Sequence, residues 1–431
     1  MFGKIKVRVL DSTKYAKKLG EEDPRRIFHA VKVGIAITLM SMFYYFKPLY
    51  HSFEEAGMWA ILTVVVVFEF TVGGTIAKGL NRGAATLVAA GLGVGAEYLG
   101  NACGNKGEPI ILGALVFLLA SVATFTRFVP RVKRRYDYGV TIFILTFTLV
   151  AVSGARASQI WKMAYERLTT ILIGGATCMV ISLCIYPVWA GQDLHNLIAT
   201  NIGKLATFLE GFGGQFCNYS ADGEDKSYLQ SHKTVLNSKA NEEILANFAW
   251  WELGHGRFKF NHPWKVYLNI GSLVRECACQ IETLSGCINS KSQVLCEFQQ
   301  KIQPSCVEMS IESSKALREL AEAIKETRFP SAAVEIHLQN SKAAAEDLKK
   351  IMENSSLPTI AGLQEIVPIL VITSVLIDII KFVEKISTSV EELSQKAGFK
   401  QRNKQAQVKP VHDHVVIDVI EIKTKYSPPQ I

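Results

Sequence analysis

Long apolar segments dominate the first 190 residues of the chain. Six of them approach the roughly 20 residues that an α-helix needs to cross a bilayer. They are residues 27–46, 57–77, 83–100, 109–128, 138–153 and 168–190. From residue 191 onward, apolar residues recur at the three- and four-residue spacing of amphipathic helices. The sequence therefore predicts an all-α membrane protein with six transmembrane helices followed by a cytosolic helical domain.

Amphipathic spacing continues through the second half of the chain. Helices are predicted from Leu194 to Phe212 and at residues 265–289, 306–327 and 333–353. An apolar run at residues 366–380 is short for a span and contains Asp378, so we interpret it as a buried helix of the cytosolic domain. A seventh span is the open alternative. The predicted organisation is a cytosolic arm (1–26), a transmembrane domain (27–190), a cytosolic helical domain (191–399) and a flexible tail (400–431).

Basic residues are unevenly distributed along this chain, which carries a formal net charge of +8 although 49% of its residues are hydrophobic. They are concentrated in the first 26 residues and in the loop between the fourth and fifth spans. Because cytoplasmic loops are enriched in Lys and Arg, both termini are predicted to lie in the cytosol. The loop between spans five and six runs against this trend, since it lies outside yet carries Arg156, Lys162 and Arg167.

Ionisable residues interrupt the first two apolar segments. Such a group costs at least about 2.5–3.5 kcal/mol inside a bilayer, so it normally faces protein or water. Glu69 lies near the middle of the second span and Lys32 lies five residues into the first. The two residues are therefore predicted to form a structural ion pair. The alternative is a functional role, in which Glu69 holds Lys32 beside a conduction path.

Lys78 and Arg82 follow the second apolar segment and are predicted to close a short hairpin between spans two and three. One interpretation is that they extend to the lipid headgroups. The other is that they attract anions, together with Arg156 and Arg167 at the opposite mouth of the bundle, because basic groups at both ends of a pathway select for anions.

Patterns typical of catalysis are weak. Glu252, His255 and His262 fall in the segment WELGHGRFKFNHPW, but its glycines and proline disfavour the regular helix that a zinc-binding motif requires. This segment is predicted to be a structural turn. The five cysteines between Cys277 and Cys306 are expected to be reduced thiols, and a metal site is the alternative. We expect no enzyme activity, no metal, no cofactor and no nucleic-acid partner.

Several segments, in order, resemble one known family. They are EDPRRIFHAVKVG (22–34), TVVVVFEFTVGGTIAKGLNRG (63–83), FVPRVKRRYDYGV (128–140), YPVWAGQDLH (186–195) and VLNSKANEEILANFAWWELGHGRF (235–258). The chain is similar here to the plant aluminium-activated malate transporters, which are anion channels. The resemblance implies a homodimer embedded in membrane lipid that conducts malate and inorganic anions such as chloride, nitrate and sulfate.

The resemblance also assigns roles to particular residues. It implies that Lys78 and Arg82 in KGLNRG, and Arg167 in YERLTTI, line the anion pathway. The same role is assigned less directly to Arg156. The family signature Trp-Glu-Pro corresponds to Trp251, Glu252 and Leu253 here, followed by His255.

Aluminium activation is predicted to be weak or absent, because a hard trivalent cation prefers clustered carboxylates. The outer loops offer only Glu54 and Glu55 together, with Glu108 and Glu166 isolated. The basic residues and the family resemblance together favour an anion channel. The alternatives are a coupled secondary carrier for organic acids and a membrane-anchored signalling protein. The plasma membrane is expected rather than the vacuolar membrane.

Overall fold

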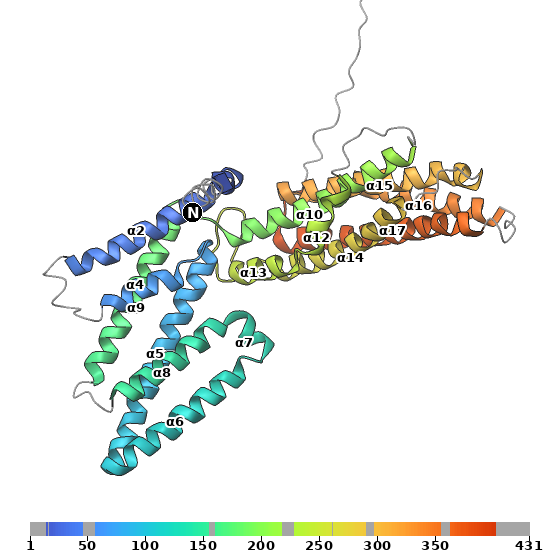
Figure 1. Cartoon of the computed structure of the whole chain (residues 1–431). Coiled ribbons are helices and arrows are strands. Elements are labelled where there is room, and N and C mark those ends of the chain that lie inside the picture. The colour runs from blue at the N-terminus through green and yellow to red at the C-terminus, as the bar shows by residue number, and fades with distance from the viewer. Residues whose placement is uncertain are drawn as a thin grey trace, which may run out of the picture.

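A computed structural model describes residues 14–15, 17–45, 57–154, 160–217, 228–260, 262–289, 297–354 and 363–401. These residues form α-helices and two isolated β-bridges. The amino-terminal half consists of α2 (Arg25–Tyr45), α4 (Gly57–Val67), α5 (Val72–Ala102), α6 (Gly104–Thr126), α7 (Pro130–Arg135), α8 (Asp137–Gly154) and α9 (Ile160–Cys184). Figure 1 shows a second group of helices extending away from this half.

The second group, which we call the carboxy-terminal bundle, contains the remaining helices. They are α10 (Ala190–Cys217), α11 (Tyr228–Ser231), α12 (Lys233–Leu236), α13 (Lys239–Ala249), α14 (Trp264–Asn289), α15 (Glu297–Glu326), α16 (Ala332–Asn354) and α17 (Leu363–Ala397). In the bundle α10 packs against α15, and α14 packs along α17 (Figure 1). The two halves meet where α10 and α13 contact α5.

The apolar stripe of α10 forms part of the bundle core. Leu194, Ile198 and Leu205 are fully buried, as amphipathic spacing predicts. The apolar run at 366–380 lies in α17, and its Leu376 is buried in the same core. This is the environment expected of a buried helix.

The second predicted span, residues 57–77, is interrupted in the structure. α4 ends at Val67 and α5 begins at Val72. Thr71 between them is extended, with φ −101° and ψ 152°, and its hydroxyl accepts a hydrogen bond from the Gly74 N–H at 3.2 Å. This is N-cap geometry, which satisfies one of the free donors at the start of a helix.

The predicted hairpin at Lys78 and Arg82 is therefore wrong. Both residues lie within α5, which continues without a break for 31 residues. The glycines of this segment lie inside the helix, and α9 packs against them. A Cβ added to Gly79 would lie 3.1 Å from Met179 Cε, and one added to Gly83 would lie 3.6 Å from Leu172 Cδ2.

The sixth predicted span, residues 168–190, also ends early, at Cys184. Pro187 disfavours helical geometry in the preceding residue. That residue, Tyr186, has a positive φ of 42°. The resulting turn leads into α10, and the Val188 carbonyl accepts a hydrogen bond from Val72 N–H at 2.8 Å.

Two of the described helices are long and apolar enough to cross a membrane, Gly107–Thr126 and Tyr165–Cys184. Gly57–Val67 and Asp137–Val152 are apolar but shorter. The all-α fold class is confirmed for the described residues, whereas the count of six spans stays a prediction.

Candidate functional site

The start of α5 is fixed by a compact set of hydrogen bonds. The Thr75 hydroxyl lies 3.1 Å from the Glu69 N–H and 3.2 Å from the Glu69 carbonyl. Together with the Thr71 cap, these contacts turn the chain back so that the Glu69 side chain lies beside the first turns of α5.

Glu69 forms its ion pair with Lys78. The ammonium of Lys78 also lies 5.6 Å from the ring centre of Tyr138. The predicted pair of Glu69 with Lys32 is therefore corrected. That prediction assumed a straight second helix, and the break before α5 brings Glu69 to Lys78 instead. The two paired side chains are 28% and 30% exposed, so the protein does not enclose either of them completely.

Lys32 has a different partner. It is 1% exposed, and its ammonium donates a hydrogen bond to the Tyr186 carbonyl at 2.9 Å. Tyr186 also stacks on Phe28, with ring centres 4.8 Å apart. Lys32 thus ties α2 to the turn between α9 and α10, which is a structural contact at the position where the sequence predicted a pathway residue.

Arg82 lies one helical turn after Lys78 and is only 3% exposed. Its Nη1 lies 3.4 Å from the Tyr138 hydroxyl, and its Nε has no hydrogen-bond partner. None of the described carboxylates forms an ion pair with it. A buried guanidinium without a counter-ion is unusual, because an unpaired charge is costly away from water.

Arg167 lies on α9, with its guanidinium 4.8 Å from the ring centre of Trp59. The contacts of Gly79 with Met179 and of Gly83 with Leu172 show that α5 and α9 run antiparallel. Arg167 is five residues before Leu172, so it lies about 7–8 Å further along the helix axis at 1.5 Å per residue. The structure therefore places Lys78, Arg82 and Arg167 at successive levels of two adjacent helices. Arg156, the remaining predicted pathway residue, lies outside the described residues.

Glu252 of the signature segment joins the two halves of the protein. Its carboxylate accepts hydrogen bonds from the N–H groups of Ala190 at 2.6 Å, Gly191 at 3.0 Å and Gly73 at 3.3 Å. Ala190 and Gly191 start α10, and Gly73 lies in the first turn of α5. One buried carboxylate therefore caps two helices.

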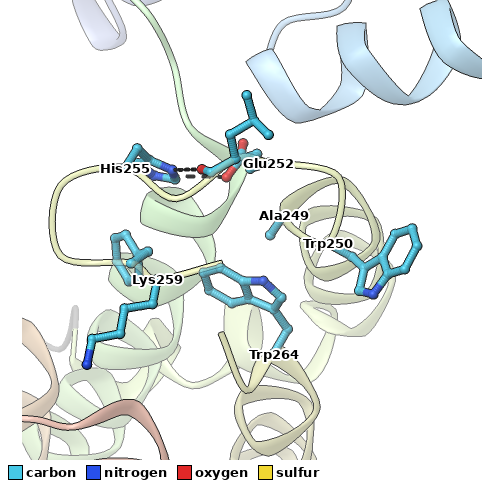
Figure 2. A pocket seen from close by; sticks show the side chains of 8 residues that line it. Ala249, Trp250, Glu252, His255, Lys259 and Trp264 are labelled. Atoms are coloured by element: carbon cyan, nitrogen blue, oxygen red, sulfur yellow. Dashed lines mark hydrogen bonds and ion pairs between the residues drawn. The ribbon is translucent and has the colours of Figure 1, made fainter. Parts of the chain in front are cut away.

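The rest of the signature packs around this carboxylate. The His255 ring stacks on Trp189 with centres 3.8 Å apart, and its Nε2 lies 4.0 Å from Glu252 (Figure 2). Trp251 meets the Tyr136 ring edge-on at 6.1 Å. Residues 251–260 and 262–263 are not helical, so the predicted structural turn is present among the described residues.

Burial raises the pKa of Glu252 to about 7, because an ionised carboxylate is poorly solvated there. The three N–H donors oppose this shift, and the nearby Asp193 adds to it. Burial also lowers the pKa of His255, which keeps that ring neutral.

Two features of the site were missed by sequence reasoning. Tyr138 contacts both cations of α5, and Gly73 and Gly191 make room for the Glu252 carboxylate. The only local signal was the placement of these glycines, each within the first turn of its helix. Within the described ranges, no three His, Cys, Asp or Glu residues lie together as metal ligands. Glu54 and Glu55 lie outside those ranges, so the aluminium prediction is untested.

The fold and the site define a class: an α-helical protein with apolar helices of membrane length and with basic side chains on adjacent helices of the same half. The sequence profile of the family described as "Aluminium activated malate transporter" matches residues 17–366. The chain belongs to this family, as the quoted motifs predicted. It is a family of membrane transporters and not of enzymes.

Named relatives agree with this assignment. The chain is 47% identical to "Aluminum-activated malate transporter 2" of Arabidopsis thaliana, over 92% of the chain and 80% of the relative. It is 45% identical to "Aluminum-activated malate transporter 7" of the same plant, over 92% and 84%. The corresponding values for "Aluminum-activated malate transporter 1" of Triticum aestivum are 43%, 90% and 86%.

Proposed function

We propose that this protein is an anion channel that passively conducts malate and other organic or inorganic anions across a plant membrane. The observation that carries the proposal is Arg82, a buried guanidinium that lacks a counter-ion among the described residues. A mobile carboxylate or inorganic anion would complete its coordination, since guanidinium groups bind carboxylates in a bidentate manner.

Lys78 and Arg167 extend the proposed pathway on either side of Arg82. Several separated charges suit conduction better than one tight site, because the anion must leave as readily as it enters. A dianion such as malate is driven outward by about 4–5 kcal/mol at 100 mV, inside negative. The proposal includes Arg156 at the outer mouth, a homodimer, cytosolic termini and the plasma membrane.

A coupled carrier is the second candidate, favoured by the break before α5. Discontinuous helices in carriers often direct a free helix N-terminus at an anionic substrate. Here the Glu252 carboxylate already occupies the N-terminus of α5. This favours the channel, because the helix end that a carrier would use for its substrate is filled by the protein itself.

Patch-clamp recording with malate, nitrate and chloride exchanged across the membrane tests the proposal. We expect single-channel currents whose reversal potential follows the anion gradient. Arg82→Glu and Lys78→Glu should abolish the current without reducing the amount of protein in the membrane. Lys349→Glu, at an exposed position of α16, is the matched control and should conduct normally.

Two results would contradict the proposal. Normal amplitude and selectivity in Arg82→Glu would show that this guanidinium has only a structural role. Transport without unitary currents, saturating with substrate and dependent on a second ion, would identify a coupled carrier.

A further inference from the structure

Glu252 connects regions that are far apart in the sequence. The residues whose N–H groups it binds lie 61, 62 and 179 positions away. Its side chain is almost completely enclosed, with 1% exposed. Such a contact links the carboxy-terminal bundle directly to the first turn of α5, a helix of the other half (Figure 1).

The surroundings of this contact leave little room for other arrangements. A Cβ on Gly73 would lie 2.3 Å from the Phe248 carbonyl oxygen and 2.7 Å from Glu252 Cγ. A Cβ on Gly191 would lie 2.4 Å from the Trp264 ring and 3.2 Å from Glu252 Oε2. Both helix starts therefore require glycine if the carboxylate is to reach their N–H groups.

The helix that Glu252 caps also carries the proposed pathway residues. Lys78 and Arg82 lie five and nine residues after Gly73, about 7.5 and 13.5 Å along the axis of α5. Within a continuous helix, a displacement of the first turn moves these residues with it.

We propose that Glu252 is a positioning residue for anion conduction, whose carboxyl group holds the carboxy-terminal bundle against α5 and thereby sets the position of Lys78 and Arg82. Its role as a positioning residue rests on the proposed channel function. The contact between the two halves does not, and it is testable separately.

Protonation of Glu252 should make the contact between the two halves depend on pH. The ionisable groups around it are Asp193 of α10, Arg25 of α2 bound to Asp193 at 2.7 Å, and His255 and Lys259 of its own loop. The groups that α5 and α14 present to it, at Gly73 and Trp264, are uncharged. Asp193 is the charged neighbour that raises the pKa of Glu252, and burial is the larger cause.

The direction in which pH changes the joining of the two halves follows from the difference between two pKa values of Glu252. Glu252 has a pKa of about 7 when the halves are joined and an ordinary pKa of 4.5 when water reaches it. Protons therefore favour the joined arrangement. Between pH 6 and pH 8 the equilibrium constant for joining should fall about tenfold.

Hydrogen exchange of the purified full-length protein tests the contact without measuring transport. After correction for intrinsic rates, exchange in peptides covering residues 70–78 and 188–196 should rise between pH 6 and pH 8 by up to about tenfold. Glu252→Gln should remove this rise, and Glu243→Gln, at an exposed carboxylate of α13, should retain it. Unchanged exchange behaviour in Glu252→Gln would overturn the proposed contact.

Channel recordings test the coupling, with chloride as the permeant anion because chloride does not titrate. The wild-type current should change with cytosolic pH around a midpoint near 7, and Glu252→Gln should lose this midpoint. Gly73→Ala should alter the current by preventing the contact while leaving the carboxyl group in place. Gly203→Ala in α10 is its control, because nothing lies within 4 Å of the added Cβ.

The outcomes separate the two hypotheses. A wild-type protein without anion current contradicts the proposed function, whereas the exchange experiment still reports on the contact. A conducting wild type whose pH profile is unchanged in both Glu252→Gln and Gly73→Ala would overturn the positioning role alone. Should Glu252→Gln not reach the membrane, Gly73→Ala decides the result.

Discussion

The ion pair between Glu69 and Lys78 leads to a prediction that separates an anion pathway from simple structural pairing. If Lys78 binds passing anions, the Glu69 carboxylate competes with them for its ammonium group. Replacing Glu69 with Gln should then tighten anion binding, although it removes an ion pair. A purely structural pair predicts the opposite, because losing either partner would weaken the protein and improve nothing.

The size of the effect follows from Coulomb's law. An anion bound to Lys78 lies roughly 7 Å from the Glu69 charge, where unit charges repel by about 2.4 kcal/mol at an effective dielectric constant of 20 and about 0.6 kcal/mol at 80. Both paired side chains are about 30% exposed, which favours the lower part of this range. We therefore expect Glu69→Gln to lower the half-saturating anion concentration about three- to tenfold.

The assay is the dependence of the current on malate and chloride concentration in excised patches. Lys78→Gln should raise the half-saturating concentration, and Asp378→Asn should leave it unchanged. Asp378 is a suitable control because it forms an exposed pair with Lys381 at 2.9 Å. The reasoning is refuted if Glu69→Gln leaves the half-saturating concentration within twofold of wild type. A second refuting result uses the single variants Glu69→Lys and Lys78→Glu and the double variant that exchanges the two charges. The reasoning fails if each single variant reduces the amount of protein in the membrane and the double variant merely restores that amount.

Three further predictions concern stability. Arg82→Met should abolish the current yet raise the unfolding free energy by about 1–3 kcal/mol, because it removes a buried unpaired charge; a lower thermal midpoint would contradict this. His195 and His262 have pKa values lowered to about 4 by burial, so stability present above pH 6.5 should be lost toward pH 4, by about 3 kcal/mol for each. Thermal unfolding of the purified protein at pH 7 and pH 4.5 measures this loss, and a thermal midpoint independent of pH would contradict it. Leu253→Pro should raise the thermal midpoint by about 1–2 °C, because Leu253 is 60% exposed and its N–H donates no hydrogen bond among the described residues; a lower midpoint would show that its backbone conformation excludes proline.

Hydrophobic periodicity predicted the helices that pack through their apolar faces. The expected helix at 138–153 corresponds to α8, Asp137–Gly154, and the stripe beginning at Leu194 is the buried face of α10. Periodicity could not locate the break at residues 68–71, because the apolar character continues through it. The break is instead held by polar contacts, among them those of Thr71 with the Gly74 N–H and of Thr75 with Glu69.

The charged residues of the candidate site were recognisable from the sequence, but their partners were not. Glu69 and Lys78 are conspicuous because they interrupt an apolar segment. The chain reverses direction at Thr71, and this reversal determines which cation forms an ion pair with Glu69. The pairing with Lys32 was predicted from positions along straight spans and did not include the reversal. Glu252 was quoted as part of a family signature, yet nothing local indicates donors that lie up to 179 residues away.

The same break explains why these features occur together. A continuous helix from 57 to 102 would satisfy its own N–H groups at residues 72–74, and a buried carboxylate would have no donors there. Ending α4 at Val67 leaves those groups free in an apolar region, where they need a negatively charged or polar partner. Val72 N–H binds the Val188 carbonyl, Gly74 N–H binds the Thr71 hydroxyl, and Gly73 N–H binds Glu252, which comes from the other half of the protein. The free helix start, the ion pair of Glu69 with Lys78 and the dependence of α5 on the carboxy-terminal bundle are thus three consequences of one interruption, so filling it with helix-forming residues should disturb all three together.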